Sequence, residues 1–219
     1  MFGRMEDILD STLSHTRTLT TQNADTSQEA AWVAASQRGD AVSFNRLVLK
    51  WERPIYNLSL RMLRDVDEAA EATQEVFLLA FKGIRRFRLD AQFSTWLYRI
   101  AANHCTSRLR KRPPGVHLSL DGSEEGTEAG RLAAAECPER EFLRRESDHR
   151  VRNALDFLQP EQRIVVELKF FQEMTFEQIA LVVEAPLSTV KSRLYHGLEI
   201  LKIRLGRGAA RDHAGMGGR

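Results

Sequence analysis

Apolar residues recur every three or four positions along most of this chain, which is the spacing that predicts amphipathic helices. Between residues 29 and 112 the pattern is interrupted at Gly39-Asp40, at Arg64-Asp65 and in the stretch FRLDAQFS, so about four helices are expected there. The positions predicted to face their core are Phe44, Leu47, Val48, Ile55, Leu58, Met62, Val76, Leu79, Ala80, Trp96, Leu97 and Ile100. No segment alternates with the period of a β-strand, and the sequence therefore predicts an all-α protein.

A linker is predicted between two helical domains, because the periodic pattern stops after residue 112 and returns at about residue 141. Residues 113–140 open with two prolines, are rich in Gly, Ser and Glu, and carry more acidic than basic side chains, which is typical of a flexible acidic linker. Residues 1–28 and 207–219 have no apolar stripe, and we expect a disordered extension and a flexible tail. The expected helical domains are residues 29–112 and 141–206.

Local signals mark the helix boundaries of the second domain. Pro160 suits the first turn of a helix because its missing N–H needs no partner there. Thr175 followed by Gln178 is a capping box, which predicts the start of a short helix. Pro186 ends this helix, since the residue before a proline is pushed out of the α region, and Ser188 is expected to cap the next helix. The predicted apolar positions are Val151, Leu155, Leu158, Ile164, Val165, Leu168, Phe171, Ile179, Ala180, Val183, Val190, Leu194 and Leu198.

The last two of these helices have the spacing of a helix-turn-helix. The small Ala180 permits a close crossing, the turn follows four residues later at Glu184, and the branched Val190 fixes the second helix against the first. The opposite face of the second helix carries groups that can contact phosphates and base edges in a major groove. Its candidate DNA-binding residues are Ser188, Thr189, Lys191, Ser192, Arg193, Tyr195 and His196. The alternative is an ordinary solvated face on a helical hairpin.

The turn position of this motif is unusual, because Glu184 stands where glycine is common. A left-handed backbone conformation costs a non-glycine residue roughly 1–2 kcal/mol. We therefore expect a turn that is either distorted or stabilised by its neighbours.

Composition narrows the function classes less than the patterning does. In the 219 residues, 32 Lys and Arg side chains nearly balance 30 Asp and Glu side chains, so the net charge of +2 says little about partners. Cys105 and Cys137 have no neighbouring ligand at zinc spacing, and neither a metal nor a cofactor is expected. No apolar run reaches the roughly 20 residues of a membrane span, and the N-terminus lacks a secretory apolar core, so we expect a cytoplasmic protein.

Two stretches of the first domain carry candidate binding residues. Acids gather at the start of DEAAEATQEVFLLAF, where they either interact with the helix dipole or, beside Phe77 and Leu78, form a protein-binding surface. The later stretch LYRIAANHCTSRLRKR contains several arginines but no acid, and its aromatic neighbours make it suited to single-stranded or melting DNA. The alternative is that Trp96 packs in the core and that the arginines form a solvated helix end.

Four stretches in a fixed order, QEVFLLAF, FSTWLYRIAAN, LQPEQRIVVELKFFQEMTFEQIA and STVKSRL, resemble those of a bacterial RNA polymerase sigma factor. The resemblance is to the extracytoplasmic-function (ECF) group of the sigma-70 family, and it extends from about residue 34 to residue 205. It implies a protein that is not an enzyme, binds core RNA polymerase at its β′ clamp and β flap, recognises the −10 and −35 elements of promoter DNA, and helps to start DNA melting. It also implies an anti-sigma protein as a partner and no small-molecule substrate.

The resemblance further implies a role for each candidate surface. The residues that match the β′ clamp-binding surface are Asp67, Glu71, Gln74, Glu75 and Phe77. Those that match the segment reading and opening the −10 element are Arg88, Asp90, Phe93, Trp96, Arg99, Asn103, Arg108 and Arg110. The face of residues 188–196 matches the −35-binding helix, and the acidic linker matches a segment that threads through the polymerase toward the RNA path.

Two other functions are compatible with parts of the sequence. A helix-turn-helix repressor or activator uses the C-terminal domain alone and binds its operator without polymerase, commonly as a symmetric dimer. A nucleic-acid enzyme needs paired carboxylates on a metal or an activated nucleophile, and the scattered acids and six histidines form no such constellation. Footprinting and metal-dependent cleavage assays with the purified protein distinguish these functions.

Overall fold

The computed structural model describes residues 27–88, 92–112, 151 and 153–214, the side chains of 207–214 excepted. The predicted N-terminal extension up to residue 26, the linker 113–140 and candidate residue Asp90 lie outside these described residues. Within the described ranges every regular element is a helix and none is a strand, which confirms the predicted all-α class.

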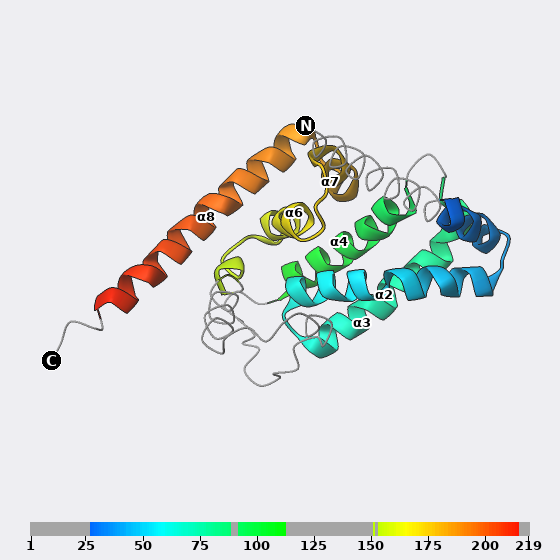
Figure 1. Ribbon diagram of the computed structural model, residues 1–219, viewed down its shortest axis with the longest axis horizontal. Coiled ribbons are helices and arrows are strands. Elements are labelled where there is room, and N and C mark those ends of the chain that lie inside the picture. The colour runs from blue at the N-terminus through cyan, green and yellow to red at the C-terminus, as the bar shows by residue number, and fades with distance from the viewer. Residues whose placement is uncertain (1–26, 89–91, 113–150, 152, 215–219) are drawn as a thin grey trace, which may run out of the picture. The chain divides into compact units, whose positions relative to one another are not determined.

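The helices follow the order expected from the periodicity (Figure 1). A first helix covers residues 27–37. It is followed by α2 (Ala41–Leu63), α3 (Val66–Gly83), the short 3₁₀ helix η1 (Ile84–Arg86) and α4 (Phe93–Lys111). The C-terminal part contains α6 (Pro160–Phe170), α7 (Phe176–Val183) and α8 (Leu187–Ala214).

The two predicted helix breaks at positions 39 and 64 are confirmed, and both use a left-handed backbone. Gly39 has φ +97°, a conformation that glycine adopts without steric cost. Arg64 has φ 58° and donates its backbone N–H to the carbonyl of Leu60 at 2.8 Å, which ends α2. A left-handed conformation has a steric cost for arginine because its Cβ approaches the following carbonyl oxygen. The side-chain contacts of Arg64, described below, offset this cost.

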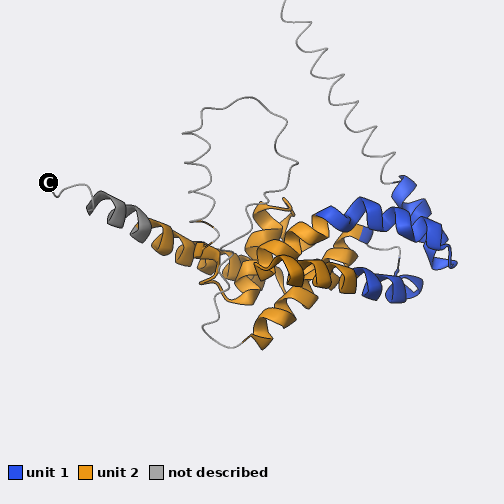
Figure 2. Ribbon diagram, turned by 90° about the horizontal axis from the view of Figure 1, so that it is seen from below, with its two compact units in different colours: residues 1–53, 77–93 blue, residues 54–76, 94–219 orange. Residues whose placement is uncertain are grey.

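Two compact units divide the described chain (Figure 2). The smaller unit comprises residues 27–53 and 77–93, and the larger one comprises residues 54–76 and 94–214. Their boundary falls within α2 and α3 and at the start of α4, so these helices belong partly to each unit.

The smaller unit has an aromatic and aliphatic core. Phe44 meets Phe81 edge to face, with ring centroids 5.0 Å apart. The side chain of Gln37 donates to the carbonyls of Ile84 and Phe87 at 3.2 and 2.6 Å, which joins the first helix to η1. Since these buried carbonyls follow the end of α3, they need such a donor.

The prediction that Leu79 is buried is wrong, because this side chain is 47% exposed. Apart from Phe77, the buried row of α3 consists of small and branched residues, and Leu79 lies next to Ala80 on the neighbouring face of the helix. The row contains Ala69, Ala72, Thr73, Val76, Phe77 and Ala80. Phe77 therefore belongs to the core, whereas its neighbour Leu78 is exposed.

In the larger unit, α6 packs against both α7 and α8. The predicted core residues Ile164, Val165, Leu168, Ile179 and Val190 are all buried. The prediction for Phe171 is wrong, because its ring is 46% exposed and lies under the guanidinium of Arg61, 4.7 Å from the ring centroid. Phe171 follows the last turn of α6 as its C-cap, where the helical period no longer applies.

The capping signals predicted for α6 and α7 are confirmed. Pro160 is the first residue of α6. At the start of α7, the backbone N–H of Gln178 donates to the Thr175 hydroxyl at 3.2 Å, and the Thr175 N–H donates to the Gln178 side chain at 2.8 Å. The inward residue near the end of α7 is Val182, so the prediction for Val183, which is only half-buried, is corrected.

The predicted cap of α8 is also wrong, because α8 begins at Leu187 and Ser188 lies in its first turn. The backbone N–H of Val190 donates to the carbonyl of Pro186 at 3.0 Å, which makes Pro186 the cap. A proline restricts the residue before it and leaves the residues after it able to become helical, so α8 starts immediately.

Gly197 brings α8 close to α6. A Cβ atom added at Gly197 would lie 3.3 Å from Val166 Cγ2. The buried stripe of α8 consequently runs through Val190, Leu194, Gly197 and Leu201, at the spacing of one helix face. Leu198, predicted to be apolar and inward, is half-buried at the margin of this stripe.

Candidate nucleic-acid and polymerase interfaces

The first turns of α8 present the predicted DNA-binding residues on a surface opposite the buried stripe. Val190 and Leu194 are buried, whereas Tyr195 is 62% exposed. Among the candidates, the exposed residues are Ser188, Lys191, Ser192, Tyr195 and His196, and the half-buried ones are Thr189 and Arg193. The surface thus gathers hydroxyl, ammonium, guanidinium and imidazole groups, which can donate hydrogen bonds to phosphates and base edges.

The turn that leads into α8 has the left-handed conformation considered for Glu184, with φ 49° and ψ 47°. Its backbone N–H and that of Ala185 both donate to the carbonyl of Ala180. The Glu184 carboxylate also accepts a hydrogen bond from Arg99 Nη1 at 3.1 Å. The backbone N–H groups of the turn are therefore hydrogen-bonded, and the contacts with Ala180 and Arg99 stabilise the strained Glu184.

Helix α4 carries most of the candidates for the −10 element, and these residues differ in their exposure. Asn103 and Arg110 are exposed, and Trp96, Arg99 and Arg108 are partly exposed. Phe93 is only 4% exposed and packs edge to face on Phe87, with ring centroids 6.1 Å apart. Arg88 is exposed and lies between η1 and α4.

The basic end of α4 is paired with acids of α3. Arg108 Nη2 lies 2.9 Å from Glu71 Oε2 and 3.7 Å from Glu75 Oε1. Burial opposes the charged form of Arg108, but the hydrogen bond and charge of Glu71, together with Glu75, raise its pKa. His104 Nε2 lies 3.1 Å from Glu75 Oε2, yet burial lowers the pKa of His104 against the effect of this carboxylate.

The candidate polymerase-binding residues of α3 do not all reach the surface. Asp67, Glu71 and Gln74 are exposed and Glu75 is half-buried, whereas Phe77 is 8% exposed. The apolar groups beside the acids are instead Leu78 and Leu79, which are 51% and 47% exposed. Leu79 was missed as a surface residue, although it follows Glu75 by one helical turn and therefore shares its face.

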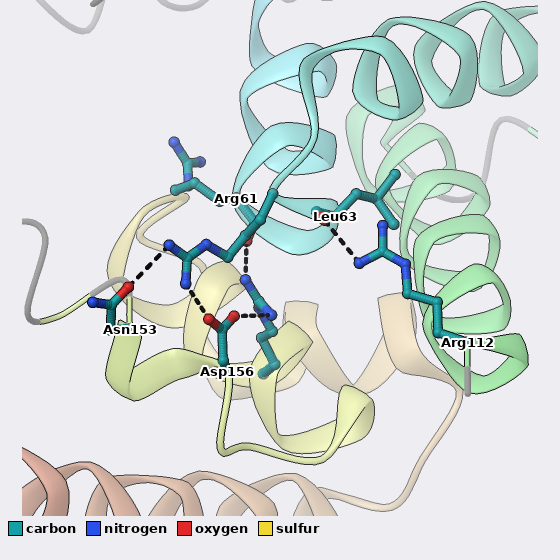
Figure 3. A network of polar contacts seen from close by, with 7 residues as sticks. Arg61, Leu63, Arg112, Asn153 and Asp156 are labelled. Carbon is teal, nitrogen blue, oxygen red and sulfur yellow. Dashed lines mark hydrogen bonds and ion pairs between the residues drawn. The ribbon is translucent and has the colours of Figure 1, made fainter. Parts of the chain in front are cut away.

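A polar network in the larger unit was not predicted (Figure 3). The guanidinium of Arg64 binds Asp156 Oδ2 and donates to Asn153 Oδ1 at 3.1 Å. Arg163 donates to the other oxygen of Asp156 at 3.1 Å and to the carbonyl of Arg61 at 2.5 Å. Asp156 thus bridges two arginines, and this pairing holds the left-handed Arg64 in place.

Glu167 extends the same network into the interior. Its side chain is 0% exposed, and its Oε2 lies 2.6 Å from Arg61 Nε. Burial raises the pKa of the Glu167 carboxyl, while Arg61 opposes this shift. A sequence signal for these charges exists: Arg163 and Glu167 are one helical turn apart within the apolar stretch RIVVELKF, beside Ile164 and Leu168.

The described part of the chain offers no metal centre and no membrane span. No three His, Cys, Asp or Glu side chains in it are grouped so that they could hold a metal ion. None of the described helices has the length and apolar character needed to cross a bilayer.

Comparison with known proteins identifies the family. Residues 47–113 match the family model "Sigma-70 region 2", and residues 148–201 match "Sigma-70, region 4". The RNA polymerase sigma-H factor of Pseudomonas aeruginosa is 36% identical over 179 residues, covering 80% of this chain and 92% of that protein. The chain belongs to the sigma-70 family. The ECF sigma factor SigW of Bacillus subtilis, 33% identical over 77% of this chain and 92% of its own length, identifies the ECF group.

Solved structures share the fold of this ECF sigma factor. CnrH, in complex with the cytosolic domain of CnrY, has a TM-score of 0.60 at 20% identity and covers 82% of this chain and 98% of its own. RpoE of Bartonella quintana, in complex with the anti-sigma factor NepR, has a TM-score of 0.56 at 18% identity, with 74% and 96% coverage. As a sigma factor, the protein binds core RNA polymerase and directs it to promoters, which confirms the function expected from the sequence.

Proposed function

We propose that this sigma factor reads the −35 element with the exposed face of α8. The observation that carries the proposal is the division of α8 into a buried stripe and a face of hydrogen-bond donors over residues 188–196. Lys191 and Arg193 suit contacts with phosphates or with guanine, and the hydroxyl groups suit either phosphates or bases. Phosphate contacts then supply salt-dependent affinity, and a few base contacts supply selection.

The −10 element and the start of melting are assigned to α4 and the segment before it. Asn103, which is exposed, and Trp96, which is partly exposed, are the groups on α4 best suited to an unstacked base. The arginines of α4 suit the phosphate backbone. Because extruding a base costs a few kcal/mol, polymerase binding and the pocket for the base must offset this cost together.

Docking on the β′ clamp is assigned to the exposed acids of α3 with Leu78 and Leu79 as apolar anchors. Glu71 and Gln74 lie on the exposed surface next to these leucines. The burial of Phe77 favours a supporting role for that ring beneath the surface. Mixed acidic and apolar surfaces of this kind suit a protein partner with complementary charge.

On this proposal, the protein binds core RNA polymerase in the cytoplasm, where transcription takes place. It catalyses no reaction itself. We assign two domains, residues 29–112 and 141–206, joined through the acidic linker 113–140, and the family matches at 47–113 and 148–201 support this assignment. An anti-sigma protein is proposed as a regulatory partner, since the Bartonella RpoE was solved in complex with the anti-sigma factor NepR.

Run-off transcription with core polymerase tests the −35 assignment. Arg193→Ala is expected to reduce discrimination between intact and altered −35 sequences by about 5- to 150-fold, the equivalent of 1–3 kcal/mol for one base contact. Core binding, measured by copurification, should be retained. The matched control is Glu199→Ala, an exposed residue of the same helix outside the donor face. Loss of core binding in Arg193→Ala, or unchanged discrimination, contradicts the assignment.

A second measurement separates this function from that of a helix-turn-helix repressor. The purified chain without polymerase should leave promoter DNA unprotected in a footprint at physiological salt, because two small binding surfaces lack a rigid spacer. Strong protection by the chain alone favours the repressor.

A further inference from the structure

The first helix, residues 27–37, lies outside both family matches, which begin at residues 47 and 148. Its last residue, Gln37, nevertheless contacts the segment that leads to α4. Gln37 Nε2 donates to the carbonyl oxygen of Phe87 at 2.6 Å and to that of Ile84 at 3.2 Å. One side-chain amide, which carries two N–H donors, thus serves two backbone carbonyls that are 50 and 47 positions away in the sequence.

We propose that Gln37 is a positioning residue for recognition of the −10 element. It fixes the backbone at Phe87, and thereby the direction in which the chain continues to Arg88, the first proposed −10 contact. Gln37 itself touches no DNA. The hydrogen bonds are contacts within the smaller unit, whereas their consequence for the −10 element rests on the proposed function.

The bond to Phe87 acts on Arg88 through the peptide plane. The carbonyl of Phe87 and the N–H of Arg88 belong to one planar peptide group, so a donor that holds the oxygen also orients the nitrogen. Phe87 has φ −65° and ψ 127°, an extended conformation that ends the 3₁₀ turn η1. Arg88 is exposed and Phe87 is buried, so the start of an exposed segment is oriented by a bond made beneath the surface.

An aromatic contact at the same point supplies a different constraint. Phe87 packs edge to face on Phe93, the first residue of α4, with ring centroids 6.1 Å apart. This contact limits the separation of η1 and α4 but does not orient the Phe87 carbonyl. The hydrogen bond from Gln37 supplies that orientation, because an N–H···O bond weakens steeply when its angle departs from linearity.

The position of Gln37 is itself fixed, because the first helix is tied to α2. Glu29 Oε2 lies 2.7 Å from Lys50 Nζ and accepts a hydrogen bond from Trp51 Nε1 at 3.1 Å. Val33 and Ser36, on the same helix as Glu29, are 1% and 5% exposed. The amide of Gln37 is therefore presented by a packed helix, and a group supported in this way can hold its partners in one geometry.

Loss of the amide donors should have a local effect. The carbonyl of Ile84 also accepts the backbone N–H of Phe87 at 3.1 Å, which closes η1. A buried carbonyl that loses a donor is strongly unfavourable unless the chain moves to let water replace it. We therefore expect the backbone at Phe87 to shift toward water in a variant without the donors, while the apolar core of the smaller unit keeps its fold.

Run-off transcription with core polymerase tests the positioning role in the full chain. Gln37→Met keeps the length of the side chain but removes both donors, and Gln37→Glu keeps its polarity but offers only acceptors at pH 8. Both variants should reduce discrimination between intact and altered −10 sequences by at least about fivefold, and by at most about 150-fold, the largest contribution of one base contact. Discrimination at the −35 element and copurification with core polymerase should be retained.

The matched control is Gln28→Met, the same substitution at an exposed position of the first helix. It should leave discrimination at both promoter elements unchanged. If the Gln37 variants lose −35 discrimination or core binding as strongly as −10 discrimination, the effect is one on the fold and the positioning role is refuted.

Hydrogen exchange followed by mass spectrometry tests the anchoring without promoter DNA. In both Gln37 variants, the peptide that contains Ile84 and Phe87 should exchange about 5- to 150-fold faster than in the parent chain, because local opening then exposes carbonyls that have already lost their donor. Peptides of α8 should exchange at the parent rate, and Gln28→Met should change neither segment.

The outcomes separate this inference from the proposed function. Unchanged exchange in the Gln37 variants overturns the anchoring, and faster exchange with unchanged −10 discrimination overturns the positioning role. Arg88→Ala and Asn103→Ala test the −10 assignment itself. If these two variants lose discrimination and the Gln37 variants keep it, only the present inference fails. If Arg88→Ala and Asn103→Ala both keep full −10 discrimination, the proposed function fails at this element.

Discussion

The left-handed turn at Glu184 predicts that glycine stabilises the protein more than alanine does at this position, which is the reverse of the order inside a helix. Replacing Glu184 by alanine removes the contact with Arg99 but keeps the strain of φ 49°, whereas glycine removes both. The strain of a left-handed non-glycine residue is roughly 1–2 kcal/mol. The larger freedom of glycine in the unfolded chain offsets about 0.5–1 kcal/mol of this gain. The glycine variant should therefore be more stable than the alanine variant by up to about 1.5 kcal/mol.

The contact with Arg99 cancels in this comparison, because both variants lack the carboxylate. Its own contribution is small, since the two side chains are 38% and 60% exposed. The matched control is Leu181, an exposed residue inside α7, three positions earlier. There the order should be reversed, with the glycine variant less stable than the alanine variant by about 1 kcal/mol.

Urea denaturation followed by circular dichroism measures all four variants, Glu184→Ala, Glu184→Gly, Leu181→Ala and Leu181→Gly. In thermal melts, 1 kcal/mol corresponds to roughly 2–4 °C for a protein of this size. If the glycine variant is less stable than the alanine variant at both positions, the turn is not left-handed in solution and the reasoning about Glu184 fails.

Three further predictions concern the packing and titration of the larger unit. Gly197→Leu should destabilise the protein by about 1–3 kcal/mol because its side chain meets Val166, and an unchanged urea midpoint would contradict the close approach of α6 and α8. Burial lowers the pKa of His104 below 6.5, so the unfolded state binds more protons and stability should fall as the pH drops below about 6.5. His104→Gln should weaken the pH dependence of stability between pH 7.5 and 5.5. An unaltered pH profile would show that His104 is not its cause. In a Cys137→Ser chain, Cys105 should react with iodoacetamide at pH 8 only after unfolding, because burial raises its thiol pKa to about 11; rapid labelling of the native protein would show otherwise.

Local signals predicted most helix boundaries correctly. Gly39, Pro160 and Thr175 each act through groups within a few residues, by a permitted left-handed φ, a missing N–H or a reciprocal capping bond. Such effects do not depend on where distant parts of the chain lie. The exception was Ser188. A serine can cap a helix, but here the carbonyl of Pro186, two residues earlier, already accepts the first hydrogen bond of α8, so Pro186 is the cap.

The burial predictions failed where two apolar neighbours compete for one position facing the core. Leu79 lies beside Ala80, and Val183 beside Val182, and in each pair the periodicity alone does not decide which residue turns inward. The packing partners decide it. In α3 the small residues face the core, so the helix approaches its neighbours closely and the larger Leu79 is left for the surface.

The sequence by itself determined the all-α class, the family and the candidate DNA-binding face, because each is encoded in the order of neighbouring side chains along a helix. Only the tertiary structure decided the partners of the buried charges. Arg61 and Glu167 are 106 positions apart, and Arg64 and Asp156 are 92 apart. Helical periodicity relates residues three and four positions apart and contains no information on which distant carboxylate an arginine meets, whereas the low dielectric of the interior makes that meeting energetically decisive.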